Sequence, residues 1–337
     1  MLILLALPAA AAPRTQPVAR FADEIIRRQA PDGAIVQDRL SPATNRVVPY
    51  FSNLAALGLL SAHSVTHDVR YLRSAKKWAA WYAAHMNADG TVYDHTGAPG
   101  AWKPTGEYDS TDSYAATYLE LLDGIARVDK PWAVARYASA GNAVKAIILT
   151  LQPVGLTLAK PMWPVMYVMD NVETSRGLRA AAHLASLCGK TIDGKDWAAR
   201  ADRMEKAIET SLWDPGRNCY LVGLQPDGGK MRAAGEWYPG VMANLMAISW
   251  AVPSKRHAKL YANMLKQPSA ALPALVKTED DMDHLVWWGL AARAAGDATR
   301  LRDIASKIEG CDPKAVPLPN TALLGQACRL LASRKEN

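Results

Sequence analysis

Acidic residues gather where apolar helical segments begin in this sequence. Asp109 and Asp112 open the segment "DSTDSYAATYLELL", and Asp170 and Glu173 open "DNVETSRGLRAAAHLA". A spacing of three residues places both acids of each pair on one face of a helix. Carboxyl groups that share a partly dry cleft raise each other's pKa, which lets one hold a proton at neutral pH. Such a pair can protonate a leaving oxygen and activate water, which is the chemistry of glycosidic bond cleavage.

We predict Asp112 and Asp170 as the catalytic pair, with Asp109 and Glu173 as supporting groups or substitutes. The structural alternative is that these acids only stabilise helix starts. Asp109 at the N-cap and Asp112 three residues later would form a near capping box. The repetition on alternate helical segments favours chemistry, because it would direct these helix starts into one cleft.

Two further helix starts are acidic. Glu236 precedes "WYPGVMANLMAIS", and "EDDMDH" at 279–284 is the densest acidic cluster in the chain. The cluster could supply a catalytic base, for which Asp283 is the candidate, bind calcium, or cap a helix. Its spacing differs from that of an EF-hand loop, and a solvated helix cap is the favoured interpretation. Asp283 and His284 are also candidates for contacts with substrate hydroxyls.

The aromatic residues favour rings that carry a polar group, with 11 Trp and 12 Tyr but only 2 Phe. Such rings can stack on the apolar faces of sugars while their N–H or O–H groups bind hydroxyls. The alternative is that they only pack loops onto helix ends. The predicted substrate-binding residues are Tyr50, Asn53, Trp102, Tyr108, Trp163, Glu236, Trp237, Tyr238, Asp283, His284 and Trp287.

Apolar residues recur at helical spacing along nearly the whole chain, which predicts twelve helices. The odd-numbered helices are amphipathic and cover 17–30, 68–86, 131–151, 195–212, 254–267 and 297–309. The even-numbered helices are richer in Ala, Gly and Leu and cover 50–62, 109–126, 170–188, 237–252, 281–295 and 319–333. Helices that are apolar nearly all round should lie inside, with the amphipathic helices packed around them.

The connections alternate in length as well. Those that precede the inner helices are long: 31–49, 87–108, 152–169, 213–236, 268–280 and 310–318. Two of them contain expected β-hairpins, "ADGTVYDH" and "NCYLVGLQPDGGKMRA". Six outer–inner pairs that close into a ring make an all-α (α/α)6 toroid, with the long loops on one rim. A superhelix of helical hairpins would need a clearer sequence repeat.

This organisation resembles the six-hairpin glycosidase superfamily. In the branch of unsaturated glucuronyl and rhamnogalacturonyl hydrolases, key aspartates open the second and third inner helices. Asp109 or Asp112 and Asp170 occupy similar places, and "VMDN" resembles that branch's "MDG"-type helix start. Two positions depart from the branch, because Tyr108 stands where it often has His and Asn171 replaces the Gly. Family 8 endoglucanases share the same frame, with a catalytic acid that opens an early inner helix.

The acids and the resemblance together predict an exported glycoside hydrolase that acts on a polysaccharide or oligosaccharide, with inversion if two acids face each other across a wide cleft. The first alternative is a lyase that acts on a uronic acid polymer, in which Tyr50, Tyr108 or Tyr114 would supply the base. A sugar epimerase would likewise need a His or Tyr base. A non-catalytic sugar-binding protein is favoured if the cleft acids pair with Arg176, with Arg179 or with backbone N–H groups as helix caps. We expect carbohydrate as the partner and neither a metal nor a cofactor.

The 337-residue chain is 50% hydrophobic and 21% charged, which is the balance of a globular protein. Its net charge of +7 includes no Lys/Arg run, which disfavours nucleic-acid binding. The start, "MLILLALPAAAAPRTQPVAR", predicts a signal peptide or disordered tail over 1–16, a single catalytic domain over 17–335, and a periplasmic or secreted protein. No later segment approaches the ~20 apolar residues of a membrane span.

The remaining motifs exclude other chemistries. Cys188, Cys219, Cys311 and Cys328 lack the spacing of a zinc site, and buried free thiols are the preferred interpretation. The sequence contains no GxSxG, HExxH or strand-linked GxGxxG motif, which disfavours serine hydrolase, metalloprotease and dinucleotide-binding functions.

Overall fold

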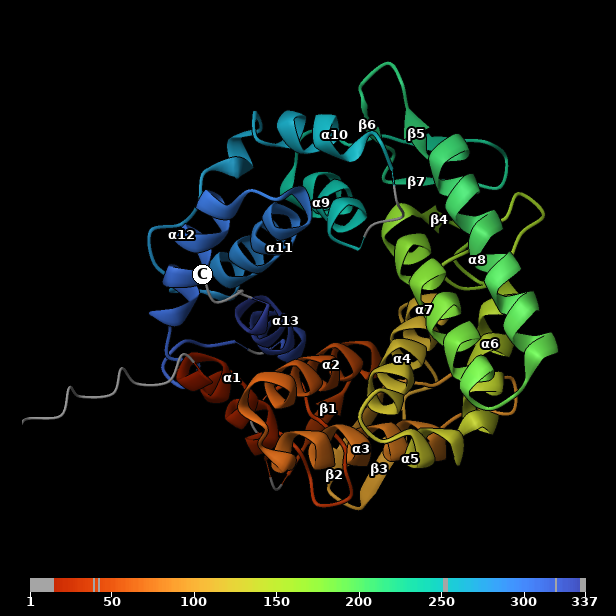
Figure 1. Cartoon of the computed structure of the whole chain (residues 1–337), viewed down its shortest axis with the longest axis vertical. Helices are drawn as coiled ribbons and strands as arrows, with labels where there is room; N and C mark the ends of the chain where they lie inside the picture. Colours follow the sequence, from red (N-terminus) through yellow and green to blue (C-terminus); the bar gives the residue numbers. More distant parts are fainter. Residues whose placement is uncertain (1–14, 39, 42, 251–253, 319, 334–337) are drawn as a thin grey trace, which may run out of the picture.

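The computed structural model describes residues 15–38, 40–41, 43–250, 254–318 and 320–333. Within these residues, six helices surround the axis of a ring and a second layer of helices encloses them, which confirms the predicted toroid (Figure 1). The inner helices are α2 (Pro49–Thr66), α4 (Thr111–Ala126), α7 (Val168–Leu187), α9 (Met242–Ser249), α11 (Glu279–Ala295) and α13 (Thr321–Ala332). The outer helices are α1 (Thr15–Arg27), α3 (Val69–Ala84), α5 (Lys130–Val134), α6 (Tyr137–Thr150), α8 (Thr191–Ser211), α10 (His257–Met264) and α12 (Ala298–Glu309).

The core lies between the two layers of helices. Nearly every residue of α4, α9 and α13 is buried, whereas α1, α8 and α12 bury only one face. This difference follows from composition, because a helix without a charged face must pack on all sides. The ring closes where α1 packs against α13 and α2. All inner helices therefore run in the same direction, and their first turns meet at one mouth of the ring.

Glycine allows the inner helices to approach closely. A Cβ added to Gly177 of α7 would lie 2.5 Å from the Cα of Ala116 on α4, and one added to Gly58 of α2 would lie 2.3 Å from the Cα of Gly325 on α13. Real side chains do not reach such distances, so these two contacts require glycine. They set the spacing of two pairs of adjacent inner helices, α4 with α7 and α2 with α13.

Replacing Gly177 by Ala should lower the free energy of unfolding by about 1–3 kcal/mol, because the added methyl group must push α7 away from α4. Gly141 on outer helix α6 has no atom within 4 Å of an added Cβ, so Gly141→Ala is the matched control. That change should be neutral or stabilising by up to about 1 kcal/mol through helix propensity. The midpoints of urea unfolding, compared at unchanged m-value, test both variants. Equal changes in the stability of Gly177→Ala and Gly141→Ala would contradict the close-packing account.

Several helix boundaries differ from the sequence prediction. Helix α4 begins at Thr111 with Ser110 at the N-cap position, so Asp109 precedes the helix and the near capping box does not form. The helix predicted over 237–252 starts as a π-helical turn, η1 (Trp237–Val241), which contains extended backbone at Tyr238 and continues as α9. A short 3-10 turn, η2 (Pro268–Ala270), precedes α11.

The long connections carry small antiparallel sheets. One has the order β1 (Asn45–Val47), β2 (His95–Ala98), β3 (Ala101–Pro104); a second has β4 (Met166–Tyr167), β7 (Gly223–Leu224), β8 (Lys230–Met231); a third pairs β5 (Trp213–Asp214) with β6 (Cys219–Tyr220). The predicted "PDGG" turn joins β7 to β8. The other hairpin was predicted over 88–95 and instead spans 95–104 with its turn at Pro99–Gly100. Asp89 explains the shift, because it accepts from the Thr91 N–H and closes a tight turn there.

The four cysteines are free thiols, as predicted; Cys311 and Cys328 are buried, whereas Cys188 and Cys219 are only half-buried. No helix among the described residues is both long and apolar enough to span a bilayer. The predicted signal peptide or tail over 1–16 lies almost wholly outside the described residues, since the description starts at residue 15.

Candidate active site

Two adjoining cavities lie at the mouth where the inner helices begin. The first has a volume of about 300 Å³ and is lined from all six inner helices, α2, α4, α7, α9, α11 and α13. The second has a volume of about 370 Å³ and extends toward the loop between α6 and α7. Residues common to both linings are Asp109, Ser110, Met169, Asp170 and Tyr238. We call the two cavities together the acidic cleft.

Asp170 lies where the two cavities meet. It belongs to the first turn of α7 and is half-buried. Burial raises the pKa of its carboxyl well above the ordinary value, and the nearby acids Asp112 and Glu173 raise it further. Within the described part of the chain, no other side chain donates a hydrogen bond to this carboxyl. Burial and these acids therefore favour the protonated form of Asp170, and its carboxyl is open to a ligand.

Glu173 lies one turn deeper on the same face of α7. Its side chain is almost completely buried, and the Tyr50 hydroxyl donates to its Oε1 at 2.7 Å. Burial raises the pKa of Glu173 to about 8, so this carboxyl is also protonated at neutral pH. Burial and the adjacent Glu173 raise the pKa of Tyr50 as well, which keeps its phenol neutral. Both side chains are therefore uncharged, and they lie next to Asp170 in the lining of the cavity.

Asp112 does not line either cavity, although the sequence predicted it as half of the catalytic pair. It is fully buried and accepts hydrogen bonds from the Thr157 hydroxyl at 2.6 Å and from the Ser113 N–H at 2.9 Å. Burial raises the pKa of Asp112 to about 7. Because α4 starts at Thr111, Asp109 and Asp112 do not share a helix face. Asp109 lines the cleft while Asp112 binds the loop behind it.

Asp283 lines the first cavity from α11. The Trp237 indole N–H donates to its Oδ2 at 2.8 Å. Burial raises the pKa of Asp283 to about 6, so the carboxylate is mainly ionised at neutral pH. The acids of the cluster at 279–284 therefore have two different roles. Asp281 completes a capping box with Thr278 at the helix start, whereas Asp283 is directed to the cleft.

The aromatic residues near the cleft fall into two groups. Tyr50 and Trp287 line the inner cavity, and Trp163 and Tyr238 lie at the outer one. The outer rings are 55% and 65% exposed, respectively, which is unusual for such large side chains and leaves their faces open to a ligand. Trp237 stacks on His284 with ring centroids 3.7 Å apart, beside Asp283.

Other predicted binding residues are not brought to the cleft. Asn53 is fully buried, where it accepts from Trp78 Nε1 and donates to the Tyr114 carbonyl. Trp102 lies on the β3 hairpin and its indole N–H donates to Asp32 at 2.7 Å.

Tyr108 and Glu236 are also absent from both cavity linings. The Tyr108 carbonyl accepts from Lys160 Nζ at 2.7 Å, which places the residue beside the outer cavity. Glu236 is exposed and accepts from the Ala234 N–H at 2.8 Å, so it stabilises its own loop.

No family model and no curated protein matches this sequence. Solved structures do match it. A rhamnosidase from Klebsiella oxytoca with rhamnose bound aligns with a TM-score of 0.62 and 15% identity, over 97% of this chain and 64% of that one. A GH63 mannosylglycerate hydrolase from Thermus thermophilus aligns with a TM-score of 0.63 and 13% identity over 95% and 99% of the two chains. A D-mannose isomerase aligns with a TM-score of 0.61 and 11% identity over 97% and 99%.

The chain shares the (α/α)6 toroid fold of these enzymes. At these identities the matches establish the toroid alone, and the chain spans only 64% of the length of the rhamnosidase.

Among the polar residues that line the acidic cleft but are missing from the sequence prediction, Lys160 and Gln326 are the two with the longest polar side chains. Lys160 lines the outer cavity from a loop position that carries no motif. Gln326 lines the inner cavity from α13, and its buried side-chain N–H₂ has no partner among the described residues. A glutamine inside the apolar run "ALLGQAC" is a signal that could have identified it. A buried amide without a partner is available to bind a ligand oxygen.

Proposed function

We propose that this protein is a glycoside hydrolase in which Asp170 is the general acid and Asp283 is the general base. The observation that carries the proposal is that both carboxyl groups line one cavity, where burial and neighbouring acids favour the protonated form of Asp170 and the pKa of about 6 leaves Asp283 mainly ionised at neutral pH. A glycosidase requires such a pair. The toroidal fold, which the rhamnosidase and the mannosylglycerate hydrolase share, supports the same assignment.

In this mechanism Asp170 gives its proton to the glycosidic oxygen as the bond to the anomeric carbon breaks. Asp283 takes a proton from the water that attacks this carbon, while the Trp237 N–H holds the base in place. Helix α9 lies between α7 and α11 in the ring. Acids on helices that are not adjacent leave room for a water molecule, so inversion is part of the proposal. Glu173 and Tyr50 position Asp170 without reacting.

The substrate is proposed to be an oligosaccharide or polysaccharide. Trp163 and Tyr238 at the outer cavity offer exposed ring faces on which successive sugar units can stack. Gln326 would bind a hydroxyl of the sugar in the inner cavity. Export to the periplasm or the medium belongs to the same proposal and rests on the N-terminal segment of the sequence.

The site gives less support to the alternatives. A lyase that uses Tyr50 or Tyr114 as its base needs an ionised phenol, whereas burial raises the pKa of both. A sugar isomerase or epimerase with a histidine base lacks that residue in the described lining of the cleft.

A binding protein without activity was favoured if arginines neutralised the cleft acids. Arg176 pairs with Glu120, and Arg179 pairs with Asp202 and Glu205, so neither neutralises Asp170 or Asp283.

The direct test incubates the purified protein with a panel of polysaccharides and oligosaccharides and measures reducing ends and ultraviolet absorbance together. New reducing ends without absorbance support a hydrolase. Both signals together identify a lyase. If neither signal develops on any member of the panel, the hydrolase proposal is contradicted, and conversion of mannose is then the assay for an isomerase.

The pH profile of kcat/KM should be bell-shaped, because it reports the proton states of the free enzyme. Activity should rise with an apparent pKa of about 6, because Asp283 is protonated and inactive below that pH. It should fall again at higher pH, where Asp170 loses the proton that burial stabilises. Circular dichroism over the same range separates this effect from unfolding. An acid limb near pH 4 would argue against Asp283 as the base.

A further inference from the structure

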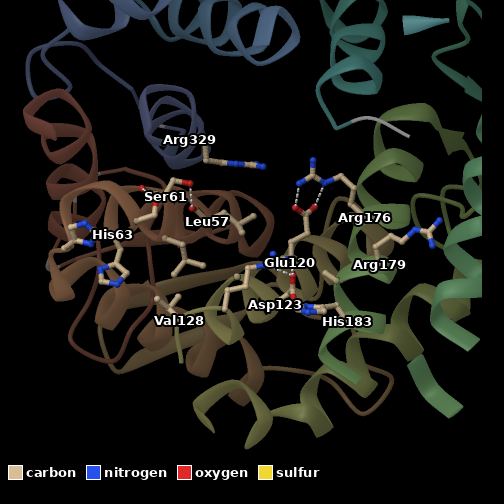
Figure 2. A pocket seen from close by; sticks show the side chains of 16 residues that line it. Leu57, Ser61, His63, Glu120, Asp123, Val128, Arg176, Arg179, His183 and Arg329 are labelled. Carbon is tan, nitrogen blue, oxygen red and sulfur yellow. Dashed lines mark hydrogen bonds and ion pairs between the residues drawn. The ribbon is translucent and has the colours of Figure 1, made fainter. Parts of the chain in front are cut away.

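A second large cavity occupies the opposite mouth of the ring. Its volume is about 770 Å³, which is enough for a small metabolite, and it is lined by the later turns of α2, α4 and α7 together with Arg329 of α13 (Figure 2). The acidic cleft uses the first turns of these helices, for example Glu173 of α7, whereas this cavity uses Arg176 and Arg179 of the same helix. We call it the far cavity.

Positive charge exceeds negative charge in the far cavity. Its lining contains four arginines and two acids. Three of the arginines have carboxylate partners: Arg127 pairs with Asp123, Arg176 with Glu120, and Arg179 with acids of outer helix α8. Arg329 pairs with no carboxylate in the part of the chain that the structure describes.

Arg329 donates instead to the amide oxygen of Gln326 at 3.1 Å. Figure 2 shows its side chain reaching from α13 across the cavity toward Arg176, whose guanidinium forms a two-pronged bond to Glu120. Burial and the Arg176 charge lower the pKa of Arg329 to about 10, so it is still charged at neutral pH. Arg293 adds a third guanidinium behind it, with a donated bond to the Arg329 carbonyl at 3.5 Å.

The positive charge of these three guanidiniums is poorly compensated, because only Arg176 has a carboxylate bound to it. A planar guanidinium matches the geometry of carboxylate and phosphate oxygens, and charge-assisted bonds of this kind are strong when partly shielded from water. We propose that the far cavity binds a small oxyanion, the carboxylate or phosphate group of a soluble metabolite, between Arg329 and Arg176. Gln326 links this site to the acidic cleft, since it accepts from Arg329 and also lines the cleft, but the anion proposal does not depend on the function proposed for the cleft.

The test measures binding to the full-length protein by isothermal titration and by thermal shift. The probes are inorganic phosphate and D-glucuronate, each at constant ionic strength with sodium chloride as the reference. A dose-dependent rise in Tm with either probe is expected, because a ligand that binds only the folded state stabilises it. Phosphate alone, glucuronate alone or both would each support the site and identify the anion class. A response to neither probe, or no more than sodium chloride produces, would overturn the proposal.

Arg329→Gln should weaken binding by about tenfold or more, because it removes a charge-assisted bond. Arg179→Gln is the matched control, since Arg179 lines the same cavity but is neutralised by Asp202 and Glu205. It should leave affinity within about threefold. Equal binding by the wild type and Arg329→Gln would overturn the assignment.

A second variant separates binding from damage to the fold. Glu120→Gln removes the carboxylate that competes for Arg176, so it should strengthen anion binding, an effect opposite to general destabilisation. Weaker binding by this variant would show that the anion does not contact Arg176.

Discussion

Replacing Asp170 by Asn should lower kcat/KM on a natural glycoside by about 10²–10⁴-fold, the usual contribution of a general acid. The amide of Asn has nearly the same shape as the protonated carboxyl but cannot give up a proton to the leaving oxygen. Aryl glycosides with an acidic leaving group need no such proton, so the same variant should lose far less activity on them. The ratio of the two losses, measured by steady-state kinetics, identifies the role of Asp170.

Asp112→Asn is the control for this prediction. Asp112 is buried behind the cleft and binds Thr157, so its replacement should reduce activity by less than about tenfold. An equal loss in the two variants on both substrate types would favour the pair predicted from the sequence over the pair proposed from the structure. Unfolding midpoints of both variants show whether any loss reflects the fold.

Replacing Asp283 by Asn should also lower kcat/KM by about 10²–10⁴-fold, but with a different dependence on substrate. Water must be activated whichever group leaves, so the loss should extend to aryl glycosides with good leaving groups. The rise in activity near pH 6 should disappear with the carboxylate, because that limb reports the ionisation of Asp283.

Asp280 provides the matched control for Asp283. It belongs to the same acidic turn of α11 but is exposed and does not line the cleft. Asp280→Asn should therefore retain full activity, and its acid limb should persist with only a small shift toward lower pH, because the Asp280 charge is a minor cause of the raised Asp283 pKa. Retention of the acid limb in Asp283→Asn would assign the base to another carboxylate, and Asp109 would be the next group to replace.

The fold could be predicted because it depends on features that are local in the sequence, namely the hydrophobic pattern of each helix and the lengths of the loops. Amphipathic helices alternate six times with helices that are apolar nearly all round. The hydrophobic pattern of each helix indicates whether it belongs to the inner or the outer layer. The loop lengths then place all helix starts on one rim. Local reasoning was less accurate at the ends of elements. Asp89 closes a turn that moves the first hairpin to 95–104, and extended backbone at Tyr238 interrupts a helix that the apolar pattern predicts as continuous.

The candidate site could be predicted only in part. Asp170 and Glu173 line the cleft because both lie on the inner face of α7, which their three-residue spacing already implied. The same spacing misplaced Asp112, since α4 starts two residues later than the acids suggest. Asn53 was expected in the cleft, but it satisfies its hydrogen bonds with Trp78 and Tyr114 in the core.

The helical pattern of the chain was thus sufficient for the toroid and for the rim at which its acids gather. Tertiary structure alone decides which acids contact a ligand and which proton state each one holds. The deciding contacts join distant segments: Thr157 binds Asp112, Trp237 binds Asp283, and Tyr50 binds Glu173. The physical reason is that a carboxyl pKa depends on burial and on neighbouring charges, and both are created only when the ring closes.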